Sequence, residues 1–499
     1  MIFHSLNYIF LFLPVTLILY NLSSLNKIRN IILILASYIF YAWGNPYLSL
    51  LLLSSSIIDY HIGKKIDHIN QISDINSTQE NTDKLVNRKK SLLIISIFFN
   101  IGLLFFFKYW DWFFGVSILA LSKLGLNIFD INSVTFQHQI QVPPGISFYT
   151  FQTLSYTLDI YKGEFKAKKS IVDYFAFVAF FPQLIAGPIE RAKDLLPQLS
   201  KFRKPITSEM AEHAFFLISW GLFKKLVFAD NLGHLVERCL ENIETPGLGL
   251  TLLIAFSFQI YCDFSAYTDI ARGTANLFGI QLKRNFLTPY FAINPSDFWK
   301  RWHISLSQWV RDYIYIPLGG NRGSKLKNTL TVLITMAIMG LWHGARKFFP
   351  IWGIYNGLLL IFYRIIPVDK YLIKTFGNIK GKIVAILIMY SFTLFGWLLF
   401  FSRDNDDFIS ILNSIFSTFS LLSASKELII SFFGISYGLI IFCLPILITE
   451  FIGYRFNLEF VDIAKKVGPI SKLIIYLLII YGILFIGSRG SYDFIYFQF

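Results

Sequence analysis

The sequence has little cysteine and little charge. Only three of its 499 residues are cysteine, and each lies in or near apolar sequence, which excludes a disulfide framework and a multi-cysteine metal site. Charged residues make up 15% of the chain, whereas a soluble globular protein carries roughly 25%. This shortage of charge excludes an ordinary soluble enzyme and a disordered tail.

Several familiar catalytic motifs and internal repeats are not expected in this sequence. We expect neither the nucleophile elbow of a serine hydrolase nor an HExxH zinc site. The glycine-rich segment 318–325 does not match a phosphate-binding loop because Ser324 separates Gly323 from Lys325, and it is typical of a turn, although basic residues nearby could attract the phosphates of a soluble donor. No internal repeat is found, which argues against a secondary transporter.

Apolar residues dominate what is present. They make up 55% of the chain, and the mean hydropathy is +0.55. At about 20 residues per membrane-spanning helix, this content suffices for up to roughly a dozen spans. We therefore expect an all-α polytopic membrane protein, a bundle of roughly 11 to 13 spans plus re-entrant or amphipathic helices. The net charge of +14 then reflects basic cytoplasmic loops and not a nucleic-acid partner.

The chain is expected to have four regions. Residues 1–62 are predicted to form N-terminal spans, because the first apolar run has no basic residue before it and no small-residue cleavage site after it. Residues 63–90 are polar and are predicted to form a solvated cytoplasmic loop. Residues 91–366 are expected to form the catalytic core. Residues 367–499 are expected to be plain apolar helices with few paired polar groups.

Two histidines stand out among eight. The other six, which lie near segment ends or in polar surroundings, are His4, His61, His68, His138, His213 and His234. His343 ends an apolar run from Thr329 that is only about 22 Å long as a helix, shorter than a hydrocarbon core of about 30 Å, so it is expected inside the membrane profile. His303 lies in a predicted amphipathic helix capped by Ser296 or Asp297.

A neutral imidazole can take the proton of a hydroxyl as its oxygen attacks a carbonyl, which is the chemistry of acyl transfer. Structural interpretations remain open: a hydrogen-bonded interfacial residue for His303 and a buried helix-end residue for His343. A zinc site formed by both histidines and an aspartate is conceivable, but no compact ligand spacing supports it.

Another polar block covers Tyr261–Gly279, where Asp263, Asp269 and Arg272 interrupt apolar sequence. Charges at membrane depth are costly unless they are paired or face a wet cavity. An internal ion-pair network and the wall of a reaction chamber are both possible interpretations, and they are compatible.

Taken together, several segments resemble the membrane-bound O-acyltransferase family, in particular its bacterial branch of alginate O-acetyltransferases and teichoic acid D-alanyl transfer proteins. The N-terminal run ending in ASYIFYAWGNP also resembles the alginate branch. The segments that carry the resemblance are PPGISFYTFQTLSYTLDIYKGE (143–164), FFPQLIAGPIERA (180–192), the block 263–279, FWKRWHISLSQWVRDYIYIPLGGNRG (298–323) and MGLWHGA (339–345).

The resemblance implies a bundle around a central tunnel, with the donor arriving from the cytoplasm and the acceptor on the other side. It implies that His343 is the general base and that His303 orients the acyl group or stabilises charge on its carbonyl oxygen. It leaves open a covalent acyl intermediate on the enzyme or on a partner. Residues expected to line the tunnel or to support the catalytic groups are Asp263, Ser265, Tyr267, Asp269, Trp302, Ser307 and Trp342.

The function implied is transfer of an acyl group, most simply acetyl from acetyl-CoA, for O-acetylation of an extracytoplasmic polysaccharide such as alginate, peptidoglycan or another exopolysaccharide. The protein is expected in the cytoplasmic membrane of a bacterium, with a separate periplasmic acetyltransferase as partner and with no metal and no bound cofactor. The alternatives are D-alanyl transfer to teichoic acid and, from another class, a non-catalytic transporter or flippase.

Overall fold

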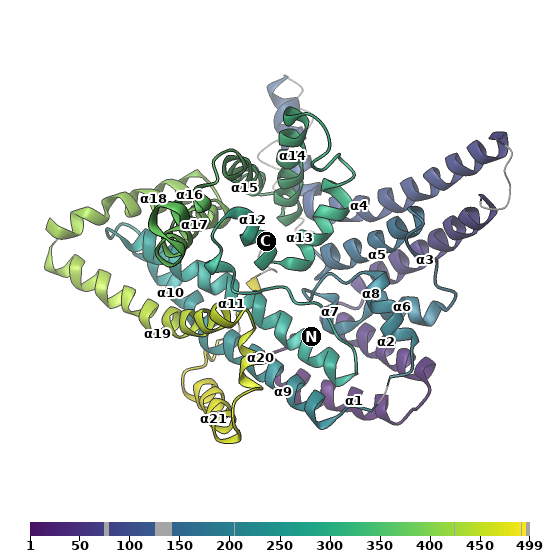
Figure 1. Ribbon diagram of the computed structural model, residues 1–499, viewed down its shortest axis with the longest axis horizontal. Coiled ribbons are helices and arrows are strands. Elements are labelled where there is room, and N and C mark those ends of the chain that lie inside the picture. The colour runs from purple at the N-terminus through teal and green to yellow at the C-terminus, as the bar shows by residue number, and fades with distance from the viewer. Residues whose placement is uncertain (74–78, 125–141, 204, 424, 491, 496–499) are drawn as a thin grey trace. The chain divides into compact units, whose positions relative to one another are not determined.

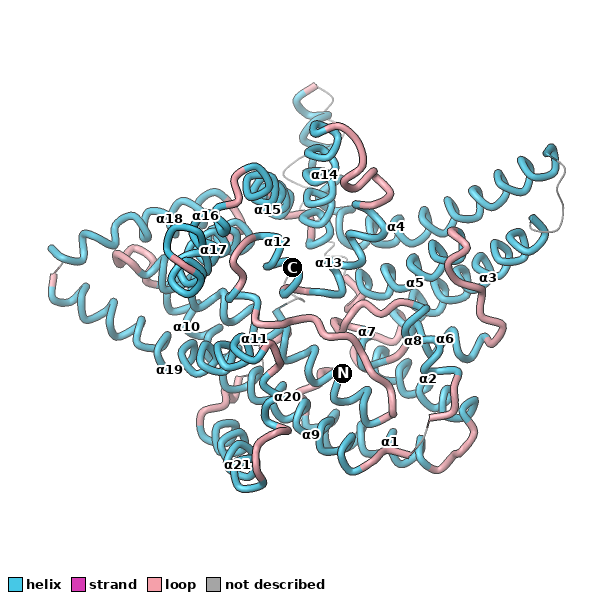
Figure 2. The backbone as a smooth tube through the Cα atoms, viewed as in Figure 1, coloured by secondary structure: helices cyan, strands magenta, loops and turns pink. Residues whose placement is uncertain are grey.

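The computed structural model is helical throughout the part of the chain that it describes. That part consists of residues 1–73, 79–124, 142–203, 205–423, 425–490 and 492–495. No strand occurs within these ranges, and Figure 2 draws them as helices joined by loops. A helix satisfies its own backbone hydrogen bonds, which is what a segment in lipid requires. The all-α fold expected from the sequence is confirmed.

The described chain divides into two compact units, and the first consists of Met1–Ile206 with Phe278–Leu282. Within it α3, α4 and α5 pack together (Figure 1). Its elements are the π-helix η1 (Asn7–Phe12), α1 (Leu13–Asn21), α2 (Asn26–Ala42), α3 (Leu48–Ser73), α4 (Gln79–Lys123), α5 (Ile146–Tyr161), α6 (Ile171–Ala179), α7 (Phe181–Leu184) and α8 (Ala192–Ser200).

The loop predicted over residues 63–90 is wrong for the described part of that segment. Helix α3 continues to Ser73 and helix α4 begins at Gln79. Lysine, arginine, glutamine and glutamate are good helix formers, so the polar composition indicates exposure and does not indicate a loop. Ile66 and Ile69, three residues apart, are both buried and keep this end of α3 packed. The cytoplasmic location of the segment stays a prediction.

The second unit consists of Thr207–Leu277 with Lys283–Phe499, and it contains both candidate histidines. Its elements are α9 (Ser208–Phe223), the π-helix η2 (Lys224–Ala229), α10 (Asp230–Glu241), α11 (Leu248–Leu277), the 3₁₀-helix η3 (Pro289–Phe291), α12 (Pro295–Arg301), α13 (Ile304–Val310), the π-helix η4 (Arg311–Tyr315), α14 (Lys325–His343), α15 (Phe348–Ile365), α16 (Val368–Phe376), α17 (Asn378–Phe401), α18 (Asn405–Phe416), the 3₁₀-helix η5 (Ser417–Ser423), α19 (Lys426–Phe456), α20 (Phe460–Ala464) and α21 (Pro469–Phe485).

Helix α11 is the centre of the second unit. It packs against α9, α10, α17, α18 and α19 (Figure 1) and is buried along nearly its whole length. Close approach to α9 depends on glycine: a Cβ at Gly221 would lie 2.8 Å from the carbonyl oxygen of Ala266, and one at Gly273 would lie 2.7 Å from that of Ala214. Small residues of this kind bring apolar helices together in membranes.

Five helical segments in the described residues are long and apolar enough to cross a membrane: residues 83–123, α11, α15, α17 and α19. Shorter apolar helices cover Asn7–Asn21 and Pro469–Phe485. Apolar side chains such as Phe433 on α19 and Phe485 on α21 are largely exposed, as on a surface that contacts lipid tails. The predicted count of 11 to 13 spans and the central tunnel stay predictions.

Candidate active site

Helix α14 ends at His343, and the contact of α14 with α15 determines its surroundings. The two helices approach so closely that a Cβ at Gly340 would lie 2.3 Å from the carbonyl oxygen of Phe349, and one at Gly353 would lie 2.2 Å from that of Met336. This contact places the ring of Trp352 edge-on to His343, with 5.2 Å between ring centroids.

His303 lies at a break between two helices. The prediction that it lies within one amphipathic helix is therefore wrong. Helix α12 ends at Arg301 and α13 begins at Ile304, and His303 between them has a φ of 41°. A non-glycine residue seldom adopts a positive φ. The predicted caps are also wrong, because Asn294 caps α12 by accepting a hydrogen bond of 2.8 Å from the backbone N–H of Asp297.

The two histidines line one small cavity within the second unit. His303 is 1% exposed and His343 is 6% exposed. The cavity has a volume of about 10 Å³, roughly what one water molecule needs. Its other lining residues are mostly aromatic: Ile260, Phe264, Trp299, Trp302, Leu306, Trp352, Trp397 and Phe400.

Burial in this aromatic surrounding controls the charge of His303, which lies outside the five candidate spans. Burial lowers the pKa of His303 to about 3. The ring is therefore neutral at physiological pH and has one N–H donor and one acceptor nitrogen. The ring of Phe264 packs edge-on against it at 4.7 Å.

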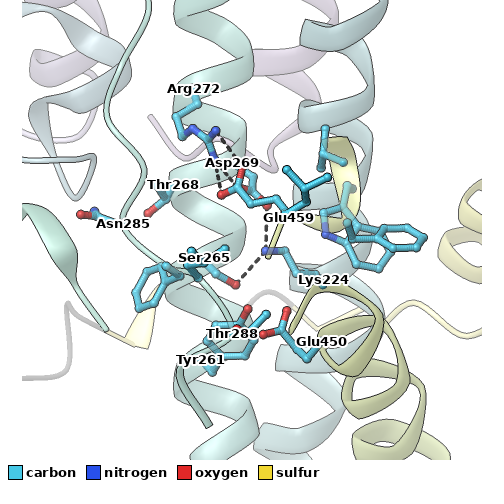
Figure 3. Close-up of a pocket in the computed structure, with 17 residues that line it drawn as sticks. Lys224, Tyr261, Ser265, Thr268, Asp269, Arg272, Asn285, Thr288, Glu450 and Glu459 are labelled. Carbon is cyan, nitrogen blue, oxygen red and sulfur yellow. Dashed lines mark hydrogen bonds and ion pairs between the residues drawn. The ribbon is translucent and has the colours of Figure 1, made fainter. Parts of the chain in front are cut away.

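A second, polar pocket lies in the same unit and also borders α11 (Figure 3). Its volume is about 30 Å³. Lys224 Nζ donates to Ser265 Oγ at 2.7 Å and pairs with Asp269 at 2.8 Å. Arg272 donates two hydrogen bonds of 2.9 Å to Glu459 and lies 3.4 Å from Asp269. The block predicted as an ion-pair network is thus an ion-pair network that also surrounds a polar pocket.

The π-helix η2 turns two consecutive lysines toward α11. Lys225 pairs with Asp263 and with Asp230, each at 2.9 Å. A π-turn adds one residue to the helical turn and rotates the residues around it, which is common at functional sites. Asp263 also accepts a hydrogen bond of 2.6 Å from the backbone N–H of Ile495. Burial raises the pKa of Asp230 to about 6, against the lowering effect of Lys225.

Comparison with known proteins decides the family. A model described as the membrane-bound O-acyltransferase family, MBOAT, matches residues 132–402, more than half of the chain. The chain belongs to this family. It is therefore a membrane-bound O-acyltransferase, as the resemblance predicted.

Two relatives of this MBOAT protein match it along most of their length. A Pseudomonas aeruginosa protein named "Probable alginate O-acetylase AlgI" is 34% identical over 461 residues, which cover 91% of this chain and 82% of the relative. A Helicobacter pylori protein named "Peptidoglycan O-acetyltransferase" is 32% identical over 460 residues, 86% of this chain and 82% of the relative. A Streptococcus thermophilus "Teichoic acid D-alanyltransferase" is 29% identical over 233 residues, 44% of this chain and 55% of the relative.

Of the predicted site residues in this MBOAT chain, some lie at the histidine cavity. Trp302 lines it with His303 and His343. Trp342 lies against both imidazoles, with its ring centroid 6.2 Å from that of His303 and 4.8 Å from that of His343. Ser307 is beside the cavity wall, where its Oγ donates to the carbonyl of Trp302 at 3.3 Å.

The remaining predicted residues lie elsewhere on α11. Ser265 and Asp269 line the polar pocket, and Asp263 belongs to the Lys225 ion pairs. Tyr267 packs on Phe494, with ring centroids 4.9 Å apart. Their roles in catalysis stay predictions.

Sequence reasoning missed several polar residues of the MBOAT chain. The polar pocket includes Lys224, Asn285, Glu450 and Glu459, and none of these was predicted. The expectation of few paired polar groups after residue 366 is corrected by Glu459, which pairs with Arg272. Burial alone would raise the pKa of Glu459, but Arg272 and Arg284 hold this pKa below its usual value. The available signals were a lysine pair within GLFKKLVFAD and a single carboxylate within ILITEFIG.

Three motif-level expectations can also be compared with the structure. Segment 318–325 is a turn, with positive φ at Gly319, Gly320 and Gly323. The sequence GISYG at 434–438 matches the pattern GxSxG, contrary to expectation, but it lies within α19 and not at a strand-to-helix turn. Within the described ranges no group of three or more His, Cys, Asp or Glu side chains is placed to hold a metal ion. His138 lies outside the described residues.

Proposed function

We propose that this acyltransferase transfers an acetyl group from cytoplasmic acetyl-CoA to a hydroxyl of an extracytoplasmic polysaccharide. The observation that carries the proposal is the pair of buried histidines, His303 and His343, in one aromatic cavity. Two relatives that match most of the chain are named as O-acetyl-transferring enzymes, one for alginate and one for peptidoglycan. The acceptor is therefore a polysaccharide hydroxyl.

His343 acts as the general base in this proposal. As the acceptor oxygen forms its bond to the acetyl carbonyl carbon, the hydroxyl proton moves to an imidazole nitrogen of His343. The tetrahedral intermediate then collapses, the carbon–sulfur bond breaks, and the CoA thiolate leaves with that proton. The base is neutral again after one turnover, so the reaction needs no other co-reactant.

His303 stabilises the charge that develops on the carbonyl oxygen. Because burial lowers its pKa to about 3, its ring carries one N–H that donates without becoming a cation. A neutral donor in a mostly aromatic cavity of low dielectric constant needs little reorganisation and acts strongly on a developing oxyanion. Trp302 and Trp342 hold the cavity around the two rings.

The cellular setting follows from the same proposal. The protein lies in the cytoplasmic membrane of a bacterium, with donor and acceptor on opposite sides. A separate extracytoplasmic acetyltransferase is the proposed partner on the acceptor side. Exposed basic residues at the turn 318–325, Arg322 and Lys325, would attract the CoA phosphates in this proposal.

The test is transfer of label from [¹⁴C]acetyl-CoA in membrane vesicles that contain the protein, with release of free CoA measured in parallel. His343→Ala is expected to abolish both while the protein still inserts. The matched control is His61→Ala, because His61 is exposed on α3 in the other unit. Wild-type label transfer by His343→Ala would overturn the assignment of the base.

The alternative of D-alanyl transfer rests on relatives that match only about half of this chain, such as the Streptococcus thermophilus protein at 44%. A transporter or flippase without acyl chemistry would release no CoA. Offering acetyl-CoA and a D-alanyl carrier-protein thioester to the same vesicles distinguishes all three functions. Label transfer from the D-alanyl donor alone would overturn the acetyl proposal.

A further inference from the structure

On its C-terminal side, the backbone break that presents His303 is held by one residue from another segment, Asn285. The backbone N–H of Ile304 donates to the Asn285 carbonyl at 2.9 Å. The side-chain Oδ1 of Asn285 accepts from the backbone N–H of Ser305 at 3.2 Å and from Ser305 Oγ at 2.6 Å. Asn285 is 0% exposed, so these bonds form without competition from solvent.

These bonds fall where the backbone most needs them. His303 has a φ of 41°, and the two residues that follow it open α13. The first N–H groups of a helix have no partner within the helix. Asn285 supplies a partner to two of them, and a sparsely populated backbone conformation persists only where its surroundings determine it.

The residues after Asn285 hold the other side of the break. The backbone N–H of Leu287 donates to the carbonyl of Arg301 at 3.0 Å, and Arg301 Nη1 donates back to the Leu287 carbonyl at 3.3 Å. The ring of Phe286 packs edge-on against Trp302 at 5.0 Å. Residues 285–287 therefore run antiparallel to residues 301–305, with Leu287 opposite Arg301 and Asn285 opposite Ile304.

We propose that Asn285 is a positioning residue for the reaction: its Oδ1, by accepting from Ser305, fixes the turn that aims the His303 ring into the catalytic cavity. The role rests on the proposed function, because His303 needs a fixed aim only if it acts on the acyl carbonyl. A displacement of about 1 Å in such a group can lower the rate about a hundredfold.

Asn285 also connects the catalytic turn to the polar pocket, which it lines (Figure 3). Its amide Nδ2 is buried and has no hydrogen-bond partner among the described residues. The side chain therefore has two separable ends. The oxygen accepts the hydrogen bonds of the turn, whereas none of those bonds depends on the nitrogen, so substitutions can change one end without the other.

Three variants use this separation. Asn285→Leu removes the acceptor at similar size, and we expect the kcat for CoA release to fall about a hundredfold with little change in the KM for acetyl-CoA. Asn285→Asp keeps an oxygen acceptor for Ser305 and replaces only the nitrogen, so it should stay within about tenfold of the wild-type kcat. Ser305→Ala removes one of the three bonds and should lower kcat about fivefold.

The matched control is Ser56→Ala. Ser56 is a fully buried serine on α3 in the other unit, and its Oγ donates one bond of 2.7 Å to the Leu52 carbonyl. The Ser56→Ala variant loses a hydrogen bond comparable to the one that Ser305→Ala loses, at a position without any connection to His303. The kcat of Ser56→Ala should equal that of the wild type.

A second measurement reports directly on the orientation and accessibility of the His303 ring. Diethyl pyrocarbonate modifies accessible imidazoles, and modification of His303 and His343 is quantified by mass spectrometry of each peptide. We expect both to be protected in the wild type, and His303 alone to become reactive in Asn285→Leu. General loosening of the fold would instead expose His343 to the same degree.

Three results would overturn the proposal: a wild-type kcat in Asn285→Leu, equal losses in Asn285→Leu and Asn285→Asp, or exposure of both histidines together. If Asn285→Leu does not fold, Ser305→Ala against Ser56→Ala makes the same test, and equal kcat values for these two would refute it. Failure of the proposed function is a different outcome, because the wild type would then release no CoA whereas the modification pattern of His303 would still respond to Asn285.

Discussion

The ring centroid of His303 lies 6.2 Å from that of Trp342, the residue directly before His343 in the chain. The same indole lies 4.8 Å from the His343 ring, so one tryptophan contacts both histidines. The two imidazoles therefore belong to one aromatic cluster, although His343 ends α14 and His303 lies between α12 and α13. Their roles should be separable by substitution, since only one of them is expected to exchange a proton.

A graded response is expected at His303. His303→Ala removes the N–H donor, and loss of one oxyanion donor lowers kcat by about a hundredfold to a thousandfold. His303→Gln keeps an amide N–H and should retain more activity than His303→Ala, whereas the same exchange at His343 should not, because an amide cannot act as a base. Rates of CoA release in vesicles make the comparison. Equal rates for His303→Gln and His303→Ala would contradict the donor role.

The low pKa of His303 predicts how stability depends on pH. Its folded pKa of about 3 is depressed below the ordinary 6.5, so its neutral form stabilises the fold fully above pH 6.5 and this contribution is lost as the pH falls toward 3. From pH 7 to pH 5 the wild type should lose about 2 kcal/mol more than His303→Gln. Asp230, with a raised pKa of about 6, contributes with the opposite sign in both proteins and cancels in the comparison.

Free energies of unfolding in mixed detergent micelles at the two pH values provide the measurement. Parallel pH dependence in the wild type and His303→Gln would show that His303 is not a buried neutral imidazole.

Gly340→Ala tests the contact between α14 and α15. A new Cβ would lie 2.3 Å from the Phe349 carbonyl oxygen, a backbone atom that can move only with its helix. We expect a loss of about 1–3 kcal/mol in stability, with a lower kcat because His343 is three residues away. Gly434→Ala is the matched control: it is also a glycine within a helix, but nothing lies within 4 Å of its Cβ position. It should be neutral or stabilising by up to about 1 kcal/mol. Equal unfolding free energies for the two variants would refute the close contact.

Lys224→Met tests the polar pocket. Removal of the lysine takes away the 2.8 Å partner of the buried Asp269 carboxylate, and breaking a buried pair in this way costs about 3–5 kcal/mol. The control is Arg403→Met, which breaks an ion pair of 2.8 Å whose arginine side chain is 64% exposed. Exposed pairs contribute about 1 kcal/mol or less, so this variant should unfold like the wild type. A Lys224→Met protein as stable as Arg403→Met would show that Asp269 does not depend on Lys224.

The sequence was sufficient to predict the helical class, because apolar content and the shortage of charge depend on composition alone. It was also sufficient to single out His343, since an ionisable residue at the end of an apolar run is conspicuous, and His303, which lies in a tryptophan-rich amphipathic segment. The break at His303 could not be predicted, because it depends on hydrogen bonds that Ser305 donates to Asn285, a residue 18 positions before His303, and no residue near His303 in the sequence indicates them. The pairing of Arg272 with Glu459 joins residues 187 positions apart, so the polar pocket could not be predicted from the sequence either.

The two-histidine cavity, at about 10 Å³, has room for about one water molecule beside the imidazoles. An acetyl group is larger than one water molecule, so lining side chains such as those of Trp302 and Trp352 must move apart before it can lie between the two rings. Access to His303 and His343 therefore depends on the packing of the tryptophans around them.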